Sequence, residues 1–295
     1  MLHSDYSFAS LCLIAALALF FALLLRITDG KLRLLRAIPS PLAAWRRICA
    51  SFVQKLNRQE RSSGALRTRG RILLFTLLSF AFLFGMLMEK ILVELHNDYL
   101  ETILLALIFL ALPNAPVPKK KEAATTFRTG IESGGVTLLQ HVLAPLTGWL
   151  LLGWPGIFMM ITLLGVRKAV MNIQTGFGYS IRRTTKLLLF PAGLLGIGII
   201  SLASFFTSKG KPLAAMRLGF EKMLTPHIAV MATISEALHL SLGGPSSYYL
   251  DLFGREWLGN GIARLQEPDM KRWTWLLTIS HCSLIVLLTT LALLL

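Results

Sequence analysis

The chain has 295 residues, of which 54% are hydrophobic and only 15% are charged, and its mean hydropathy is +0.63. Soluble domains carry about 25% charged residues, so this composition excludes an ordinary soluble enzyme. The apolar residues also lie in long runs. These runs predict an all-α, polytopic membrane protein that forms a single integral membrane domain over residues 1–295.

The formal charge of +15 comes from 30 Lys and Arg against 15 Asp and Glu. No RNA- or DNA-binding motif accompanies this charge, so we expect no nucleic-acid partner. Cytoplasmic loops of membrane proteins collect Lys and Arg, so the excess indicates orientation in the membrane and contact with membrane lipid. Three widely spaced cysteines, with no CxxC pair, predict neither a disulfide framework nor a zinc site.

The first apolar run, Phe8 to Leu25, is about long enough to cross the hydrocarbon core of a bilayer. It has no Lys or Arg before it and a basic stretch after it, the reverse of a signal peptide, so it predicts an anchor with its amino terminus outside. Residues 26–71 then carry 12 Lys or Arg and two acidic residues, so they are expected to form a cytosolic basic loop. This loop includes an expected amphipathic helix from Leu42 to Leu56.

The other apolar runs predict further crossings. Three are clear, and a fourth is short and contains Glu101; the clear ones are Ile72–Met88, Leu187–Thr207 and Trp275–Leu295, and the short one is Tyr99–Leu112. Two longer polar segments separate them. These are a proline- and lysine-rich cytosolic linker, 113–135, and a polar loop, 208–273, whose mixed charges do not assign it to either side.

Residues 136–166 are apolar but interrupted by glycine and proline, most densely at Gly153-Trp154-Pro155-Gly156. Two short helices meeting there would form a re-entrant helical hairpin. A single kinked span is the alternative, because neighbouring helices can accommodate a proline. The segment 167–186 that follows has five basic residues and no acid, which favours a hairpin with both ends inside. The chain therefore has about five to six transmembrane helices.

Several polar or glycine-rich signals have both a chemical and a simpler interpretation. Glu132, the only carboxylate between Ala123 and Phe220, is either a metal ligand or base or an exposed loop acid. Gln140 and His141 are either functional groups at membrane depth or interfacial residues. The basic residues of 167–186 either hold phosphate groups or flank a span. The glycines of 193–198 lie inside an apolar run, so close helix packing is expected rather than a phosphate loop.

The segment 242–261 alternates glycines, aromatic residues and charges without a helical period. It contains Leu242-Gly243-Gly244-Pro245, the pair Tyr248-Tyr249, and Trp257-Leu258-Gly259-Asn260-Gly261. Such a segment is more typical of a binding loop than of a plain connector.

Three regions, taken in order, resemble the CobD/CbiB family of cobalamin biosynthesis, the adenosylcobinamide-phosphate synthases. Gly130–Ser133 followed by Val142–Leu146 is similar to the family's IES…VVAPLFW stretch, and Lys168–Tyr179 is similar to KAVNTLDSMVGY. Leu242–Pro245 and Trp257–Gly261 are similar to LGGP and a PWxGDG-like close. Near the amino terminus, Asp29-Gly30, Ile38–Pro41 and Leu56–Arg58 follow the family's GDP, PHPV and LNR order. The resemblance covers most of the chain at low identity.

The resemblance implies a ligase of the bacterial inner membrane that joins a corrinoid, adenosylcobyric acid, to aminopropanol or its phosphate. It implies ATP, which would activate the carboxylate, and Mg²⁺, but it specifies no protein partner. Two positions carry over as catalytic, Glu132 and Lys168, and Glu132 is also a candidate metal ligand. The implied substrate-binding residues are Arg128, Tyr179, Arg182, Arg183, Gly243, Gly244, Pro245 and Tyr248.

The chain departs from the family pattern where the family has acidic residues. Val136-Thr137 and Gln140 stand where the family has Glu-Asn and Asp, and Gln174 replaces another Asp. The acid of the family's SPN…WPE segment has no counterpart near His227. Because magnesium prefers carboxylates, an alternative is a non-catalytic membrane relative that binds a corrinoid or a partner, or that signals. A small transporter would fit the spans, but the chain lacks paired acids and inverted repeats.

Overall fold

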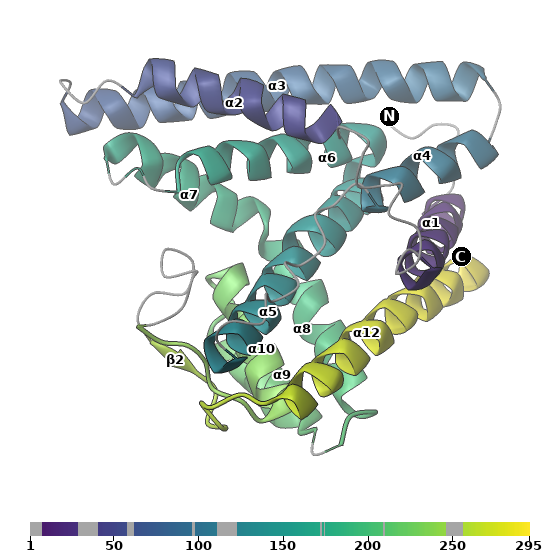
Figure 1. The fold of residues 1–295 in the computed structure, drawn as a ribbon. Helices are drawn as coiled ribbons and strands as arrows, with labels where there is room; N and C mark the ends of the chain where they lie inside the picture. Colours follow the sequence, from purple (N-terminus) through teal and green to yellow (C-terminus); the bar gives the residue numbers. More distant parts are fainter. Residues whose placement is uncertain are drawn as a thin grey trace. The chain divides into compact units, whose positions relative to one another are not determined.

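The computed structural model describes residues 8–28, 41–57, 62–95, 98–110, 123–171, 173, 175–208, 210–245 and 256–295. The described residues are almost entirely helical, so the predicted all-α class is confirmed (Figure 1). The chain divides into two compact units. Unit 1 comprises residues 1–111, 144–188 and 289–295, and unit 2 comprises residues 112–143 and 189–288.

The elements follow one another as helices with one small sheet near the carboxyl end. In chain order they are α1 (Phe8–Thr28), α2 (Pro41–Leu56), α3 (Ser63–Glu94), α4 (Asp98–Leu110), α5 (Ala123–Thr137), the π-helix η2 (Leu138–Leu143), α6 (Ala144–Ala169), α7 (Gly176–Leu188), α8 (Phe190–Ser204), α9 (Pro212–Glu221), α10 (Pro226–Leu238), β1 (Leu242–Gly243), β2 (Trp257–Leu258) and α12 (Glu267–Leu294). The segment expected as a polar loop, 208–273, thus contains two helices and both strands. The second half of the expected linker, residues 123–135, is helix α5.

The core of unit 1 lies where α2, α6 and α7 pack on α3. Apolar residues recur at helical spacing on these helices, so each buries one stripe against the others; the buried set is Cys49, Val53, Leu66, Leu73, Leu74, Leu77, Leu163, Val166, Val170, Phe177 and Ile181. Trp45 ties α2 to α6, because its indole N–H donates to Thr162 Oγ1 at 2.9 Å. The predicted amphipathic helix at 42–56 is therefore a packed element of this unit.

A second contact within unit 1 joins α1 to α4. The buried face of α1 is made largely of small side chains, among them Cys12, Ala15 and Ala18, which let another helix approach closely. The indole N–H of Trp149, at the start of α6, donates to the carbonyl oxygen of Leu11 at 3.1 Å. This bond satisfies a buried indole group in an otherwise apolar setting.

Helix α6 breaks at Gly153, whose φ of 62° and ψ of −139° are not helical. A Cβ added to Gly156 would lie 1.9 Å from the carbonyl oxygen of Gly148, so the backbones on either side of the break touch. Residues eight positions apart would be about 12 Å apart in a straight helix. The predicted break at 153–156 is therefore confirmed, and it takes the form of a sharp bend.

The bend also holds a buried carboxylate of the short apolar helix α4. Glu101 is 2% exposed, and its Oε1 accepts a hydrogen bond from the indole N–H of Trp154 at 2.7 Å. Gly85 of α3 lies against the backbone of Trp154 and Pro155, so no side chain separates the two helices there. Trp154 thus links the bend to α4.

Three helical runs in the described residues are long and apolar enough to span a membrane: Ser63–Glu94, Phe127–Ala169 and Glu267–Leu294. A fourth is added if α7 and α8, which are bent by 50°, count as one broken span. The described parts of α1 and α4 are shorter apolar helices, Phe8–Leu23 and Tyr99–Phe109. A membrane protein is thus supported, and the predicted count of five to six spans is approximate.

Unit 2 is organised around α10, almost every residue of which is buried. Helix α8 packs on α10 through glycines: a Cβ on Gly193 would meet Pro226, and one on Gly196 would meet Val230 and Leu143. The predicted role in helix packing is confirmed for Gly193 and Gly196 but not for Gly198, where an added Cβ would meet nothing within 4 Å. Helix α9 approaches α10 in the same way, because Gly219 lies against Thr233.

Burial makes a testable prediction for one cysteine. Cys49 of α2 is fully buried, and burial raises the pKa of its thiol to about 11. Because only the thiolate reacts, the native protein should leave Cys49 unmodified by iodoacetamide at pH 7.5, and unfolding in denaturant should expose it. Mass spectrometry of the tryptic peptide measures both states. Labelling of Cys49 at the rate of a free thiol in the native protein would contradict this burial.

Candidate functional site

Glu132 lies in α5 and is the centre of the candidate site in unit 2. Its side chain is 0% exposed, and its Oε1 accepts a hydrogen bond from the backbone N–H of Gly243 at 2.8 Å. The interpretation of Glu132 as an exposed loop acid is therefore wrong. The carboxylate instead anchors a glycine-rich loop 111 residues further along the chain.

That loop adopts a conformation that only glycine tolerates well. Gly243 and Gly244 both have a φ of 76°, in the left-handed region. Gly243 pairs with Trp257 in the antiparallel β1–β2 ladder, and the N–H of Gly244 donates to the carbonyl oxygen of Glu256 at 2.9 Å. A Cβ on Gly244 would also lie 2.7 Å from the Trp257 ring. The two glycines thus permit both the turn and the close approach to the tryptophan.

Arg128, one helical turn before Glu132, contacts Trp257 of the same sheet. Its guanidinium lies 4.7 Å from the centre of the Trp257 ring, and it donates a hydrogen bond to the carbonyl oxygen of Ala263. Ser241 closes the loop, because its hydroxyl contacts the carbonyl oxygens of Gly259 and Gly261 at 3.1 and 3.2 Å. Arg128 and Glu132 together hold Gly243, Trp257 and Ala263 to α5.

Helix α5 can approach α12 and α10 closely because glycines stand at the two points of contact. A Cβ on Gly134 would lie 2.7 Å from the Trp273 ring of α12, and one on Gly135 would lie 2.8 Å from Ile234 of α10. Glycine in a helix interior costs about 1 kcal/mol relative to alanine. Here that cost is offset by close packing that brings Glu132 within reach of the loop.

The chain directly after α5 forms a π-helix, an element often found at functional sites. Its Gln140 donates through Nε2 to Nε2 of His227, the second residue of α10, at 2.8 Å. His227 is 2% exposed and Gln140 is half-buried, so this is a partly buried polar contact between two helices. The sequence singled out Gln140 but not its partner, because the two lie 87 residues apart. His141, the neighbour of Gln140, is also buried.

The basic candidates of unit 1 differ in their surroundings. Lys168 and Arg183 are exposed, and Arg67 lies 5.7 Å from the centre of the Tyr179 ring. Arg182 instead donates to the carbonyl oxygens of Ile173 at 2.7 Å and Val170 at 3.3 Å. Arg182 therefore stabilises the turn that follows α6 by donating to its carbonyl oxygens.

The adjacent arginines give a matched pair of variants. Arg182→Gln should lower the free energy of unfolding by about 1 kcal/mol, because it removes charge-assisted hydrogen bonds to backbone carbonyls. Arg183→Gln should change it by less than about 0.5 kcal/mol, as is usual for an exposed side chain. Thermal unfolding of the purified protein in detergent measures both. Equal effects would contradict the capping role of Arg182.

The described residues of the family-like motifs form one group in each unit. In unit 2, Glu132 and Arg128 meet Gly243 and Gly244, and Pro245 follows them as an exposed residue. In unit 1, Lys168, Tyr179, Arg182 and Arg183 lie at the end of α6 and on α7, and Thr175 Oγ1 donates to Asn57 Oδ1 at 3.1 Å. Tyr248 and Gln174 lie outside the described residues.

Among the described residues, the side chains around Glu132 do not supply the oxygen ligands of a magnesium–ATP site. No group of three or more His, Cys, Asp and Glu side chains that could hold a metal ion occurs in the part of the chain that the structure describes. Mg²⁺ requires oxygen ligands in a near-octahedral arrangement. Glu132 is the one carboxylate that the resemblance offers, and one of its oxygens already accepts the Gly243 N–H. Glu132 thus serves as an anchor of the loop.

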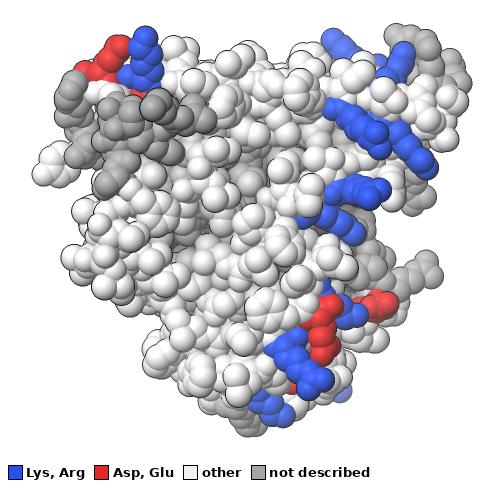
Figure 2. Space-filling view, turned by 180° about the vertical axis from the view of Figure 1, so that it is seen from behind, with Lys and Arg blue, Asp and Glu red and all other residues white. Residues whose placement is uncertain are grey.

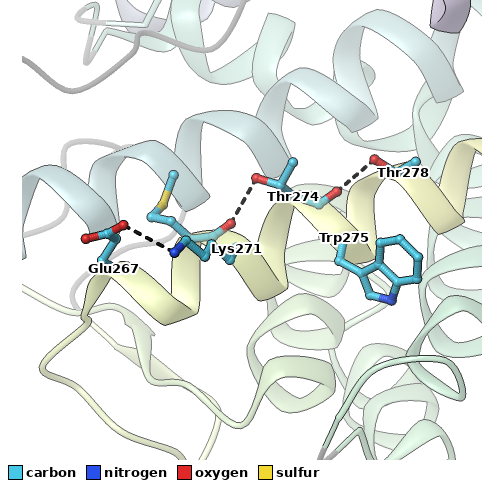
Figure 3. A pocket seen from close by; sticks show the side chains of 6 residues that line it. Glu267, Lys271, Thr274, Trp275 and Thr278 are labelled. Carbon is cyan, nitrogen blue, oxygen red and sulfur yellow. Dashed lines mark hydrogen bonds and ion pairs between the residues drawn. The ribbon is translucent and has the colours of Figure 1, made fainter. Parts of the chain in front are cut away.

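A surface hollow of about 440 Å³ lies on one side of α12 (Figure 3). Its lining is drawn entirely from α12: Glu267, Met270, Lys271, Thr274, Trp275 and Thr278. The two threonine hydroxyls donate to carbonyls of their own helix, and Lys271 lies 3.5 Å from Glu267. The polar groups are therefore already paired, and the hollow contains no residue predicted for the site.

Comparison of the chain with protein-family models, characterised proteins and solved structures gave no match.

Proposed function

We propose that this chain is a multi-pass protein of the bacterial inner membrane, related to the CobD/CbiB synthases, that binds a corrinoid without joining it to an amine. The observation that carries the proposal is the role of Glu132. The carboxylate at the family's IES position is fully buried and holds the N–H of Gly243. This carboxylate therefore has a structural role, holding the loop that begins at Gly243.

The chemistry of amide formation supports the same conclusion. A carboxylate must be activated before an amine can displace its oxygen, and activation by phosphoryl transfer needs metal ions or Lys and Arg to stabilise the transferring group. The chain has Gln140 and His227 in segments where the resemblance expects acids, and these two side chains bond to each other. No step through ATP or magnesium is therefore assigned to this protein.

The glycine-rich loop supports a binding role. Four contacts hold it: the Glu132 anchor, the Arg128–Trp257 contact, the β1–β2 ladder and the Ser241 hydroxyl. Residues 241–245 and 256–261, held in this way, lose little conformational entropy when a ligand binds to them. The choice of a corrinoid as the ligand is based on the order of the family-like motifs in the sequence.

The test combines a binding assay with an activity assay on the purified full-length protein. Cobyric acid and cobinamide should bind in a titration followed by corrinoid absorbance. The protein should give no amide product by mass spectrometry when ATP, Mg²⁺ and aminopropanol phosphate are added. A strain that lacks the synthase should not be rescued. Rescue of that strain would show that the protein is an active synthase. Failure to bind both cobyric acid and cobinamide would refute the corrinoid assignment.

A further inference from the structure

Unit 1 carries a stripe of exposed basic residues on two packed helices. Arg67 and Arg71 lie one turn apart on α3, and Arg183 and Lys186 lie four and seven positions after Tyr179 on α7. Residues at these spacings share one face of a helix. Arg67 stacks against Tyr179, so the two faces meet. We call these five residues, the four cations and Tyr179, the basic stripe.

The stripe has no acidic neighbour among the described residues of unit 1. The acids with described side chains there are Glu89, Glu94 and Glu101, in the last third of α3 or in α4. Arg71 and Glu89 are 18 residues apart on one helix, which is about 27 Å. In Figure 2, Lys and Arg with no Asp or Glu beside them lie at the upper right, whereas the Asp and Glu at the upper left lie next to a further Lys or Arg. No carboxylate among the described side chains of unit 1 therefore balances the charges of the stripe.

Exposed apolar residues directly follow the basic ones on both helices. Ile72, which follows Arg71, is 59% exposed, and Leu187, which follows Lys186, is 74% exposed. Lys and Arg beside lipid-facing side chains, with an aromatic ring such as Tyr179, are typical of the border between headgroups and hydrocarbon. A soluble phosphate compound would instead need donors that converge in a hollow, and these side chains lie on an open surface.

We propose that the basic stripe binds the phosphate groups of anionic phospholipids at the membrane border. The cations attract the headgroups, and Ile72 and Leu187 contact the acyl chains below them. This assignment uses only residues of unit 1, so it holds or fails separately from corrinoid binding by the loop of unit 2.

The experiment counts phosphatidylglycerol bound to the detergent-solubilised full-length protein by native mass spectrometry, with phosphatidylcholine as the reference lipid. The variant Arg67→Gln/Arg183→Gln/Lys186→Gln should lose affinity for phosphatidylglycerol roughly a hundredfold, at about fivefold for each charge removed. Affinity for phosphatidylcholine should not change. A second variant with Arg183→Gln and Lys186→Gln alone leaves the Arg67–Tyr179 contact intact and should lose about 25-fold.

The matched control removes the same number of charges from unit 2, as Arg217→Gln/Lys222→Gln/Lys271→Gln. Each of these cations lies within 3.1 to 3.6 Å of a carboxylate, so its charge is already balanced. This control should keep wild-type affinity for phosphatidylglycerol. An equal loss in the control, or no preference of the wild type for the anionic lipid, would overturn the proposal. Displacement of the lipid by millimolar inorganic phosphate would also overturn it, in favour of a soluble anion.

Discussion

Replacement of Gly156 by alanine should lower the free energy of unfolding by about 3 kcal/mol, the largest effect we expect from a single methyl group in this chain. The new Cβ would lie 1.9 Å from the carbonyl oxygen of Gly148 and 2.6 Å from its carbonyl carbon. Backbone atoms cannot rotate away as a side chain can, so the two arms of the bend would have to separate. Thermal unfolding in detergent, followed by circular dichroism, measures the loss.

Gly198 provides the control for this prediction. It also lies in an apolar helix, α8, but a Cβ added there meets nothing within 4 Å. Gly198→Ala should therefore leave stability unchanged or raise it by up to about 1 kcal/mol, because alanine is the better helix former. If both variants unfold at the wild-type temperature, Gly148 and Gly156 are not in contact and α6 does not bend as described.

Replacement of Glu132 by alanine should release the glycine loop from α5. The change leaves the Gly243 N–H without its acceptor and removes a fully buried side chain, at a combined cost of about 2–4 kcal/mol. Glu132→Gln keeps an oxygen for the Gly243 N–H and should cost less, about 1–2 kcal/mol. Hydrogen exchange at the peptide that contains Gly243 measures the release directly, and it should be much faster in the alanine variant.

The same pair of variants distinguishes an anchor from a catalytic base. An anchoring carboxylate predicts that Glu132→Gln retains ligand binding and a protected loop. If Glu132 were a catalytic base or a metal ligand, Glu132→Gln should abolish synthase activity as fully as Glu132→Ala does, while the peptide that contains Gly243 stays protected from exchange. The second pattern would restore the synthase interpretation.

Arg182 and Arg183 are neighbours of the same residue type, yet their roles differ, and the sequence could not predict that difference. Both arginines belong to the basic stretch that flanks a span, so the sequence predicts the same role for each. Only the turn after α6 decides that Arg182 reaches the carbonyl oxygens of Val170 and Ile173. The Gln140–His227 contact could not be predicted from the sequence either, because it depends on how η2 packs near the start of α10.

The opposite holds for the break in α6. Gly153 and Pro155 interrupt the helix through their own backbone preferences, so the sequence locates the break to within a few residues. How closely the two arms approach depends on Gly148 as well, and that contact involves residues eight positions apart.

The composition alone determined that this is a helical membrane protein with a basic excess, because apolar run length and charge are properties of the chain itself. The polar segments at 113–135 and 208–273 contain the buried helices α5 and α10, which their local polarity conceals. The tertiary structure alone decided that Glu132 is an anchor. Its fate depends on a peptide N–H supplied by a loop more than a hundred residues away, and local patterns carry no information about such a partner.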